Sequence, residues 1–185
     1  MRYFIVLVLL IFYGVSSSAD DSGDRRRGGQ HEEGHVPKVF DAQGKFVGYF
    51  VAGSGGEGVY LEINGAVVFA AIGRASIDNG AHVSANQWQW ASVGFIPYAS
   101  SDCSGPPLMF YYSGAQPSME VRQGTDVLLY VAGNGYTSTV HASSVRQNPT
   151  IQQCTAYSYD IPVFQVDPSG YSLTQHYPEP LTIRY

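Results

Sequence analysis

The segment HEEGH at residues 31–35 fits the pattern H-E-x-x-H. In that pattern two histidines one helical turn apart bind zinc, and the glutamate between them acts as a general base. The pattern needs a helix, but Gly28 and Gly29 precede the segment, Gly34 interrupts it and Pro37 follows it. A zinc protease also builds most of its sheet before this helix, which the short preceding stretch does not allow. We therefore interpret HEEGH as a chance match and expect no metal site and no catalytic residue here.

A second motif, GSGGEG at residues 53–58, fits the dinucleotide-binding pattern G-x-G-x-x-G. In a nucleotide site these glycines open a helix whose N-terminus meets the pyrophosphate. Here the next residues, VYLEING, have the composition of a strand and a hairpin. The sequence therefore predicts a loop between strands and no cofactor.

Histidines at 82, 141 and 176, with many serines and several aspartates, leave a Ser-His-Asp hydrolase possible by composition. No serine lies in a G-x-S-x-G elbow, the turn that presents the nucleophile in many hydrolases. His141 alternates with Thr139 and Ser143, which places it on the polar face of a strand. An exported hydrolase with an unrecognised site stays an alternative.

The segment QWQW at residues 87–90 is the clearest candidate for ligand binding. In an extended chain Trp88 and Trp90 project from one face, and Tyr157 and Tyr159 in AYSY have the same spacing. Flat aromatic rings beside amide groups suit sugars, whose C–H faces stack on rings and whose hydroxyls bond to amides. The alternative is that these rings pack in the core, because tryptophan buries a large area.

The first 19 residues predict a secretory signal peptide that is cleaved after Ala19. Arg2 is followed by an apolar run to Val15, which is shorter than the roughly 20 residues that a membrane span needs. Residues 20–38 have almost no large apolar side chains and are predicted to be a disordered tail. No later segment is apolar enough to span a membrane. We expect a secreted or periplasmic protein whose folded domain covers residues 39–185.

Cys103 and Cys154 are the only cysteines of the chain. In an oxidising compartment two cysteines form a disulfide by default. The bond would close a loop of about fifty residues, for which the chain-entropy model gives about 4 kcal/mol of stabilisation. A redox role is disfavoured, because the pair lacks C-x-x-C spacing.

The formal net charge is −5, and only 14% of the residues are charged. Outside RRR at residues 25–27 the chain has no basic stripe, which argues against nucleic acid as a partner. The partners that this composition allows are a glycan or another protein. The oligomeric state is left open.

From Val39 onwards glycine and proline interrupt windows rich in Val, Ile, Thr, Tyr and Phe, as is typical of strands and turns. In VYLEINGAVVFAAI, Asn64 and Gly65 predict a type I′ hairpin. In SMEVRQGTDVLLYVAG, Met119 and Val121 should point to one face, and Glu120 and Arg122 to the other.

The expected strands also include 92–98, 108–112, 137–145, 161–166 and 181–184. VVFA (67–70) and VLLYV (127–131) are apolar on both faces and should be central strands. The fold class predicted is all-β, an antiparallel sandwich or barrel of about nine or ten short strands.

Two segments, DAQGKFVG at 41–48 and YASSDCSG at 98–105, fit the patterns D-x-x-G-x-x-V-G and Y-x-S-x-D-C-S-G. With the Asn-Gly hairpin between them, they resemble a loose set of uncharacterised exported bacterial β-rich domains. The likeness covers residues 39–112. It implies an extracellular, disulfide-bearing β fold, and it implies no reaction.

The sequence thus favours a non-enzymatic binding module for glycans or proteins, with Trp88, Trp90, Tyr157 and Tyr159 as candidate contacts. A pocket that joins a histidine, an acid and a Ser or Thr would favour the hydrolase instead. A third hypothesis is a structural or self-associating protein. A long unpaired apolar edge at 127–131 or 181–185 would favour that role.

Overall fold

The computed structural model describes residues 36–53, 56–77, 80–110, 114–147 and 153–185. All of these residues belong to one structural unit, Glu33–Tyr185. The HEEGH segment, the predicted signal peptide and most of the predicted tail lie outside the described residues. The all-β fold class is confirmed: the described ranges contain twelve strands, all paired antiparallel, and one helix of four residues.

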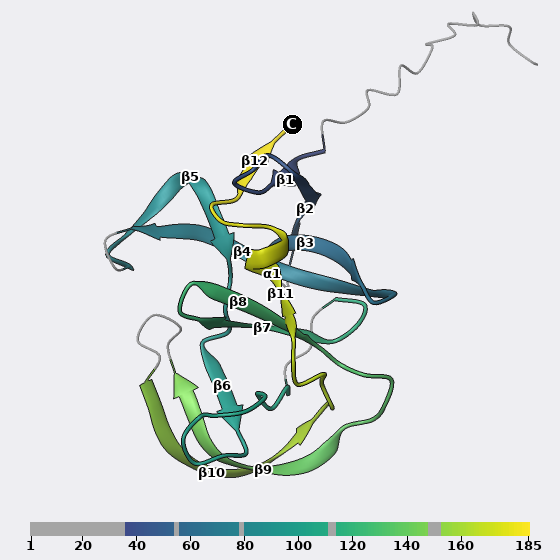
Figure 1. Ribbon diagram of the computed structural model, residues 1–185, viewed down its shortest axis with the longest axis vertical. Coiled ribbons are helices and arrows are strands. Elements are labelled where there is room, and N and C mark those ends of the chain that lie inside the picture. Colours follow the sequence, from purple (N-terminus) through teal and green to yellow (C-terminus); the bar gives the residue numbers. More distant parts are fainter. Residues whose placement is uncertain (1–35, 54–55, 78–79, 111–113, 148–152) are drawn as a thin grey trace, which may run out of the picture. The chain divides into compact units, whose positions relative to one another are not determined.

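Six strands form one sheet with the order β12-β1-β2-β3-β4-β5 (Figure 1). Its strands are β1 (Lys38–Phe40), β2 (Phe46–Gly53), β3 (Gly56–Ile63), β4 (Ala66–Ile77), β5 (His82–Trp90) and β12 (Thr182–Arg184). The two edges meet where Trp88 and Leu181 exchange backbone hydrogen bonds of 2.8 and 2.7 Å. The sheet is therefore a nearly closed barrel around the larger apolar core.

The remaining strands form two three-stranded sheets, with the orders β10-β9-β6 and β11-β8-β7. The first contains β6 (Phe95–Tyr98), β9 (Ser138–Gln147) and β10 (Gln153–Val163). The second contains β7 (Ser118–Gln123), β8 (Asp126–Val131) and β11 (Tyr171–Ser172), and α1 (Leu173–His176) follows β11 directly. Figure 1 shows β7 and β8 between the six-stranded sheet and the strongly bent strands β9 and β10.

The β7–β8 hairpin contributes to two apolar cores. Val127 and Leu129 belong to the core of the six-stranded sheet, which also holds both tryptophans. Met119, Val121 and Tyr130 belong to a second core with residues of β6. VLLYV is thus a central strand that is covered on both faces, as its composition predicts.

The other face of β7 is polar, and its side chains bond to the backbone of β4 and β5. Ser118 Oγ donates to the Phe69 carbonyl at 2.9 Å. The Glu120 carboxylate accepts from the Ala71 N–H at 2.6 Å. The predicted alternation is confirmed: Met119 and Val121 point to one face, and Glu120 and Arg122 point to the other. The polar face, however, packs against another sheet and not against water.

Arg122 continues this polar contact to the C-terminal segment. Its guanidinium donates to the Trp90 carbonyl at 2.8 Å and forms two bonds, of 3.1 and 2.7 Å, to the Glu179 carboxylate. Glu179 also accepts from the Trp90 N–H at 2.6 Å. One bidentate ion pair therefore joins β5, β7 and the segment that leads into β12.

Several local predictions are confirmed and others are wrong. Asn64 and Gly65 turn the β3–β4 hairpin with φ values of 52° and 81°. VVFA lies in a central strand in which Val68, Phe69 and Ala70 are buried; Val67 is half exposed, so one of the two faces is covered only in part. In the described part of segment 108–112, Met109 makes only an isolated bridge to Phe164.

Strand boundaries differ from the predictions in three further places. The strand predicted at 161–166 is the end of β10, which begins at Gln153. The first strand begins at Lys38, which the predicted tail includes, because Lys38 pairs with both Tyr49 and Arg184. Of the residues proposed as free edges, 127–131 lie in β8 between β7 and β11 and do not support self-association through an open edge. β12 ends the strand order: it pairs with β1 on one side, and on the other side Leu181 bridges to Trp88.

The Cys103–Cys154 disulfide is confirmed, with a Cα–Cα distance of 5.9 Å and a separation of 51 residues. It ties the loop after β6 to the start of β10. No helix in the described ranges is long and apolar enough to cross a membrane.

Removing the disulfide should cost stability without changing the fold. The double substitution Cys103→Ser/Cys154→Ser frees a loop of 51 residues, and we expect the free energy of unfolding to fall by about 4 kcal/mol. Urea unfolding followed by fluorescence measures this change. The parent protein under dithiothreitol should show the same loss; an unchanged midpoint in both would contradict the expectation.

Glu120 should make stability depend on pH. Burial raises the pKa of its carboxyl from 4.5 to about 7, against the lowering effect of the backbone N–H groups that bond to it. Because the folded protein then binds more protons than the unfolded chain between pH 4.5 and 7, the free energy of unfolding should fall by about 3 kcal/mol as pH rises through this window.

Glu120→Gln should remove this part of the pH dependence, because the amide oxygen still accepts from Ala71 but carries no charge. Glu62→Gln, at an exposed position of β3, is the matched control and should keep the parental slope. Urea unfolding from pH 4.5 to 8 measures the three slopes. If Glu120→Gln kept the parental dependence of the unfolding free energy on pH, another group would be responsible for that dependence.

Candidate functional site

A hollow among the described residues lies where the β3–β4 turn, the end of β8 and the turn before β11 meet. Its volume is about 400 Å³. We call it the Tyr171 hollow. Its wall is formed by Ile63, Asn64, Gly65, Ala66, Gln116, Leu129, Val131, Ala132, Gly133, Asn134, Asp167, Ser169, Gly170 and Tyr171.

The wall combines an apolar side with convergent polar groups. Val131 and the Tyr171 ring supply apolar surface, whereas Leu129 belongs to the wall but is fully buried. The polar residues of the wall come from four segments: Asn64, Gln116, Asn134, and the turn that holds Asp167 and Ser169. Small-molecule sites usually have mostly apolar walls with a few placed polar groups, and this wall is more polar than that.

A short turn fixes the acidic group of the hollow. The Asp167 carboxylate accepts from the Ser169 N–H at 2.9 Å and from the Ser169 hydroxyl at 2.6 Å. Gly170 has φ +63°, a conformation that suits glycine, and it lies against the Tyr130 ring. The bonds from Ser169 hold the pKa of Asp167 below its ordinary 3.8. At neutral pH the hollow therefore contains a carboxylate in a defined position.

The Tyr171 ring is also held in place. Tyr171 pairs with Leu129 across β11 and β8. One face of its ring stacks on His176, with ring centres 4.2 Å apart and planes inclined by 21°. His176 in turn bonds to the Ser172 carbonyl through Nδ1 at 2.7 Å. Burial, and the neighbouring Tyr177, raise the pKa of the Tyr171 hydroxyl, so it stays a hydrogen-bond donor at neutral pH.

Gln116 connects two sides of the wall. Its backbone N–H donates to the Val67 carbonyl at 3.0 Å, and its side-chain amide donates to the Ala132 carbonyl at 2.6 Å. The first bond reaches β4 and the second reaches the end of β8. The amide is thus fixed by tertiary contacts, and its position does not depend on a ligand.

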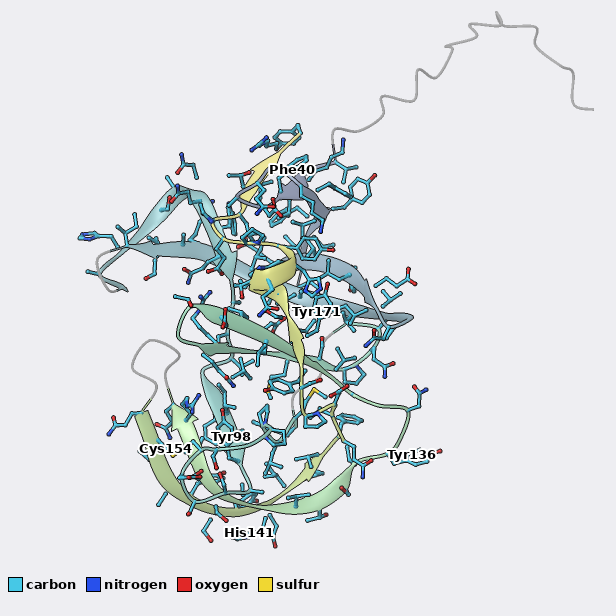
Figure 2. All side chains as sticks on the ribbon, viewed as in Figure 1. Phe40, Tyr98, Tyr136, His141, Cys154 and Tyr171 are labelled. Atoms are coloured by element: carbon cyan, nitrogen blue, oxygen red, sulfur yellow. A yellow bond between two sulfur atoms is a disulfide. The ribbon has the colours of Figure 1, made fainter. Side chains whose placement is uncertain are left out.

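Tyr136 extends the site towards solvent. Its side chain is 97% exposed, and Figure 2 shows it projecting outward from the loop between β8 and β9. A small hollow of about 60 Å³ beside it shares Gly133 and Asn134 with the Tyr171 hollow. An exposed aromatic ring therefore lies next to the larger cavity.

Trp88 and Trp90, the pair predicted to contact a ligand, share one face as expected, but that face is the core. Their exposed fractions are 5% and 0%. Trp88 packs edge-on against Phe50, and the Trp90 indole N–H donates to the Tyr177 carbonyl at 3.0 Å. The alternative of core packing therefore holds, because the only polar atom of Trp90 finds a partner inside. Neither ring is available as a sugar platform.

Tyr157 and Tyr159 behave differently from each other. Tyr157 is half-buried and packs edge-on against Phe95, with ring centres 5.5 Å apart. Tyr159 is 62% exposed, and its ring centre lies 6.4 Å from that of Tyr157. Neither lines the Tyr171 hollow, so the structure does not bring them together with the site.

His141 lies on the exposed surface of β9 and pairs with Asp160 of β10 at 2.7 Å. The two side chains are 55% and 67% exposed, and Figure 2 shows His141 at the outer surface of the bent sheet. Neither residue lines the Tyr171 hollow, the small hollow beside Tyr136 or a further hollow on the opposite face of β8. Within the described ranges, no three His, Cys, Asp or Glu side chains converge as metal ligands do.

A second aromatic surface lies on the outer face of the six-stranded sheet. Phe40, Phe46 and Tyr49 form a series of edge-on contacts with ring centres 5.9 and 5.4 Å apart. Tyr60 occupies the neighbouring position on β3 and is 49% exposed. We call these four residues the outer aromatic row.

Comparison with known proteins finds no matching family model, no matching curated protein and no matching solved structure. The site is therefore interpreted from its own geometry. Sequence reasoning missed it because its walls come from turns. The local signals were NGY (134–136), a tyrosine in a glycine-rich loop, and DPSGY (167–171), an aspartate turn that ends on an aromatic residue.

Substituting a core tryptophan should impair folding. Trp90→Ala leaves a cavity in the larger core and an unpaired Tyr177 carbonyl, and we expect a loss of about 3–5 kcal/mol in the free energy of unfolding. Tyr159→Ala, at an exposed position, should change it by less than about 0.5 kcal/mol. Urea unfolding measures both. A stable Trp90→Ala protein that had lost a ligand would contradict the core assignment.

Proposed function

We propose that this protein is an exported, non-enzymatic binding module whose Tyr171 hollow holds a sugar residue of a glycan. The observation that carries the proposal is the composition of that hollow. A tyrosine that is held in place and a valine share the wall of a cavity of about 400 Å³ with three amide residues and one aspartate. This volume suits a small ligand.

Sugar rings have two kinds of surface, and the hollow offers a partner for each. Their C–H faces are apolar and pack on aromatic or aliphatic side chains, here Tyr171 and Val131. Their hydroxyls donate to carboxylates and exchange hydrogen bonds with amides, here Asp167 and Asn134. Hydrogen bonds to a charged group are the stronger kind, so Asp167 should contribute most to orientation.

Binding is favoured over hydrolysis because the hollow contains a single acid. Glycoside hydrolysis generally uses two carboxyl groups that flank the scissile bond. Asp167 is the only acidic residue in the wall, and bonds from Ser169 lower its pKa. A general acid would need the opposite shift. The exposed His141–Asp160 pair lines neither the Tyr171 hollow nor the other two hollows and does not support a hydrolase either.

Export is part of the proposal and rests on two features. The disulfide is of the kind that persists in oxidising compartments. The apolar N-terminal segment has the features of a signal peptide. The resemblance to exported bacterial β-domains agrees with this location.

A protein partner is the second candidate function, and the outer aromatic row favours it. Phe46, Tyr49 and Tyr60 are each about half exposed on one sheet face. Exposed aromatic residues are enriched at protein interfaces. This surface and the Tyr171 hollow can be tested separately.

A glycan array with graded variants tests the proposal. The parent protein should bind a restricted set of glycans. Asp167→Asn should weaken binding by about tenfold or more, because it removes the charge from a hydrogen bond while the amide oxygen keeps the turn. Tyr136→Ala, at the exposed margin, should weaken it less.

Tyr60→Ala is the matched control, because it removes an exposed tyrosine from the outer aromatic row. It should leave glycan affinity unchanged. Titration calorimetry with the best glycan from the array provides the affinities. Absence of any glycan ligand, or equal losses in Asp167→Asn and Tyr60→Ala, would reject the glycan assignment and favour the protein partner.

A further inference from the structure

A second hollow lies on the opposite face of β8. The Tyr171 hollow is lined by Leu129 and Val131, whereas this one is lined by Leu128 and Tyr130, which alternate with them. Its volume is about 490 Å³, and Arg146 stands in its wall. We call it the Arg146 hollow.

The Arg146 guanidinium has few partners for a charged group. One of its terminal nitrogens donates to the Cys103 carbonyl at 3.2 Å. Its Nε is buried and has no hydrogen-bond partner in the described part of the chain. No carboxylate among those residues forms an ion pair with it. A cation in such surroundings loses hydration without gaining a counter-charge.

Hydroxyl and amide groups surround this cation. The guanidinium lies 5.4 Å from the centre of the Tyr98 ring, whose buried hydroxyl has no hydrogen-bond partner among the residues that the structure describes. Tyr130 and Gln123 belong to the wall and interact through their side chains. Burial raises the pKa of both tyrosines, although the positive charge of Arg146 acts against the rise. Both hydroxyls therefore remain donors at neutral pH.

Acidic residues occur in the neighbouring turns, but their carboxylates accept hydrogen bonds from serines of the same turns. The Asp102 carboxylate accepts from the Ser104 hydroxyl at 2.6 Å. The Asp167 carboxylate accepts from the Ser169 hydroxyl at the same distance of 2.6 Å. Both serines line the hollow, whereas Asp102 and Asp167 do not. The local turns thus hold the two acids outside the wall and leave Arg146 without a counter-ion.

The position of Arg146 is fixed on three sides. It lies on the central strand β9, where it faces Ile96 of β6 and Cys154 of β10. The Cys103 carbonyl that it contacts belongs to a loop held by the disulfide and by Ser144, whose hydroxyl accepts from the Cys103 N–H at 3.0 Å. The guanidinium itself is held by its bond to this carbonyl and by its contact with the Tyr98 ring, which lowers the entropic cost of binding.

We propose that the Arg146 hollow is a binding site for a small oxyanion, that is, a sulfate, phosphate or carboxylate group. The planar guanidinium presents parallel N–H donors that match the oxygen spacing of these anions. An anion at the terminal nitrogens would neutralise a charge that has no ion-pair partner among the described residues. This proposal does not rest on the proposed glycan function: the two hollows lie on opposite faces of β8 and share only Ser169.

Nuclear magnetic resonance tests the site directly through the Nε–H signal of Arg146 in the purified protein. Sodium sulfate, inorganic phosphate and sodium acetate are titrated separately at constant ionic strength. We expect saturable movement of this signal with at least one anion. Saturation by sulfate or phosphate alone indicates a tetrahedral ligand, and saturation by acetate alone indicates a carboxylate.

Arg146→Gln should weaken binding by about tenfold or more, as expected for the loss of a charge-assisted pair. Arg146→Lys should restore only part of it, because lysine keeps the charge but lacks the planar fork. The matched control is Arg184→Gln, whose guanidinium lies over the Phe40 ring in the parent protein. Backbone amide signals of Ser104 and Gly105 provide the affinities of all variants.

Two results would overturn the proposal. In the first, none of the three anions moves the Arg146 signal of the parent protein saturably. This experiment needs no variant, so it is informative even if Arg146→Gln does not fold. The other is equal affinity of Arg146→Gln and Arg184→Gln, which would show that the anions bind elsewhere. Glycan binding in the same samples reports separately on the Tyr171 hollow.

Discussion

The polar face of β7 determines how the sheets of this protein are joined. Ser118, Glu120 and Arg122 bond to the backbone of β4 and β5 at Phe69, Ala71 and Trp90. Side chains here replace the backbone partners that a neighbouring strand would supply. Unpaired backbone groups are costly when they are buried, so each of these bonds matters more than its net strength suggests. The opposite face of the same strand is apolar and forms the second core. One strand therefore serves two layers through the alternation of its side chains.

Both hollows depend on this arrangement. Because β7 is fixed against β4, its partner β8 is covered on both faces and offers different residues to each side. Leu129 and Val131 line the hollow that we assign to a sugar, and Leu128 and Tyr130 line the hollow that we assign to an oxyanion. Ser169 of the turn at 167–170 contributes to both walls. The protein thus has two candidate sites on opposite faces of β8, next to one shared turn.

The sequence could predict what depends on alternation and turn chemistry. The all-β class, the Asn64–Gly65 hairpin, the central position of 127–131 and the two faces of β7 follow from such patterns. The sequence could not say which face meets water. Trp88 and Trp90 share a face as predicted, but that face points into the core. Glu120 has an ionisable side chain, yet it is only 4% exposed. The Tyr171 hollow was not predictable either, because its walls come from turns that are distant in the chain and meet only in the folded protein.

Native-state hydrogen exchange of the Ala71 and Trp90 amides tests the central role of β7 most directly. Both amides donate to side-chain carboxylates, those of Glu120 and Glu179, and not to a strand. If the polar face of β7 holds the layers together, these two amides should exchange only through global unfolding, with the same free energy as core amides such as that of Leu129. Exchange of Ala71 and Trp90 through a local opening, well below the global free energy, would contradict the account.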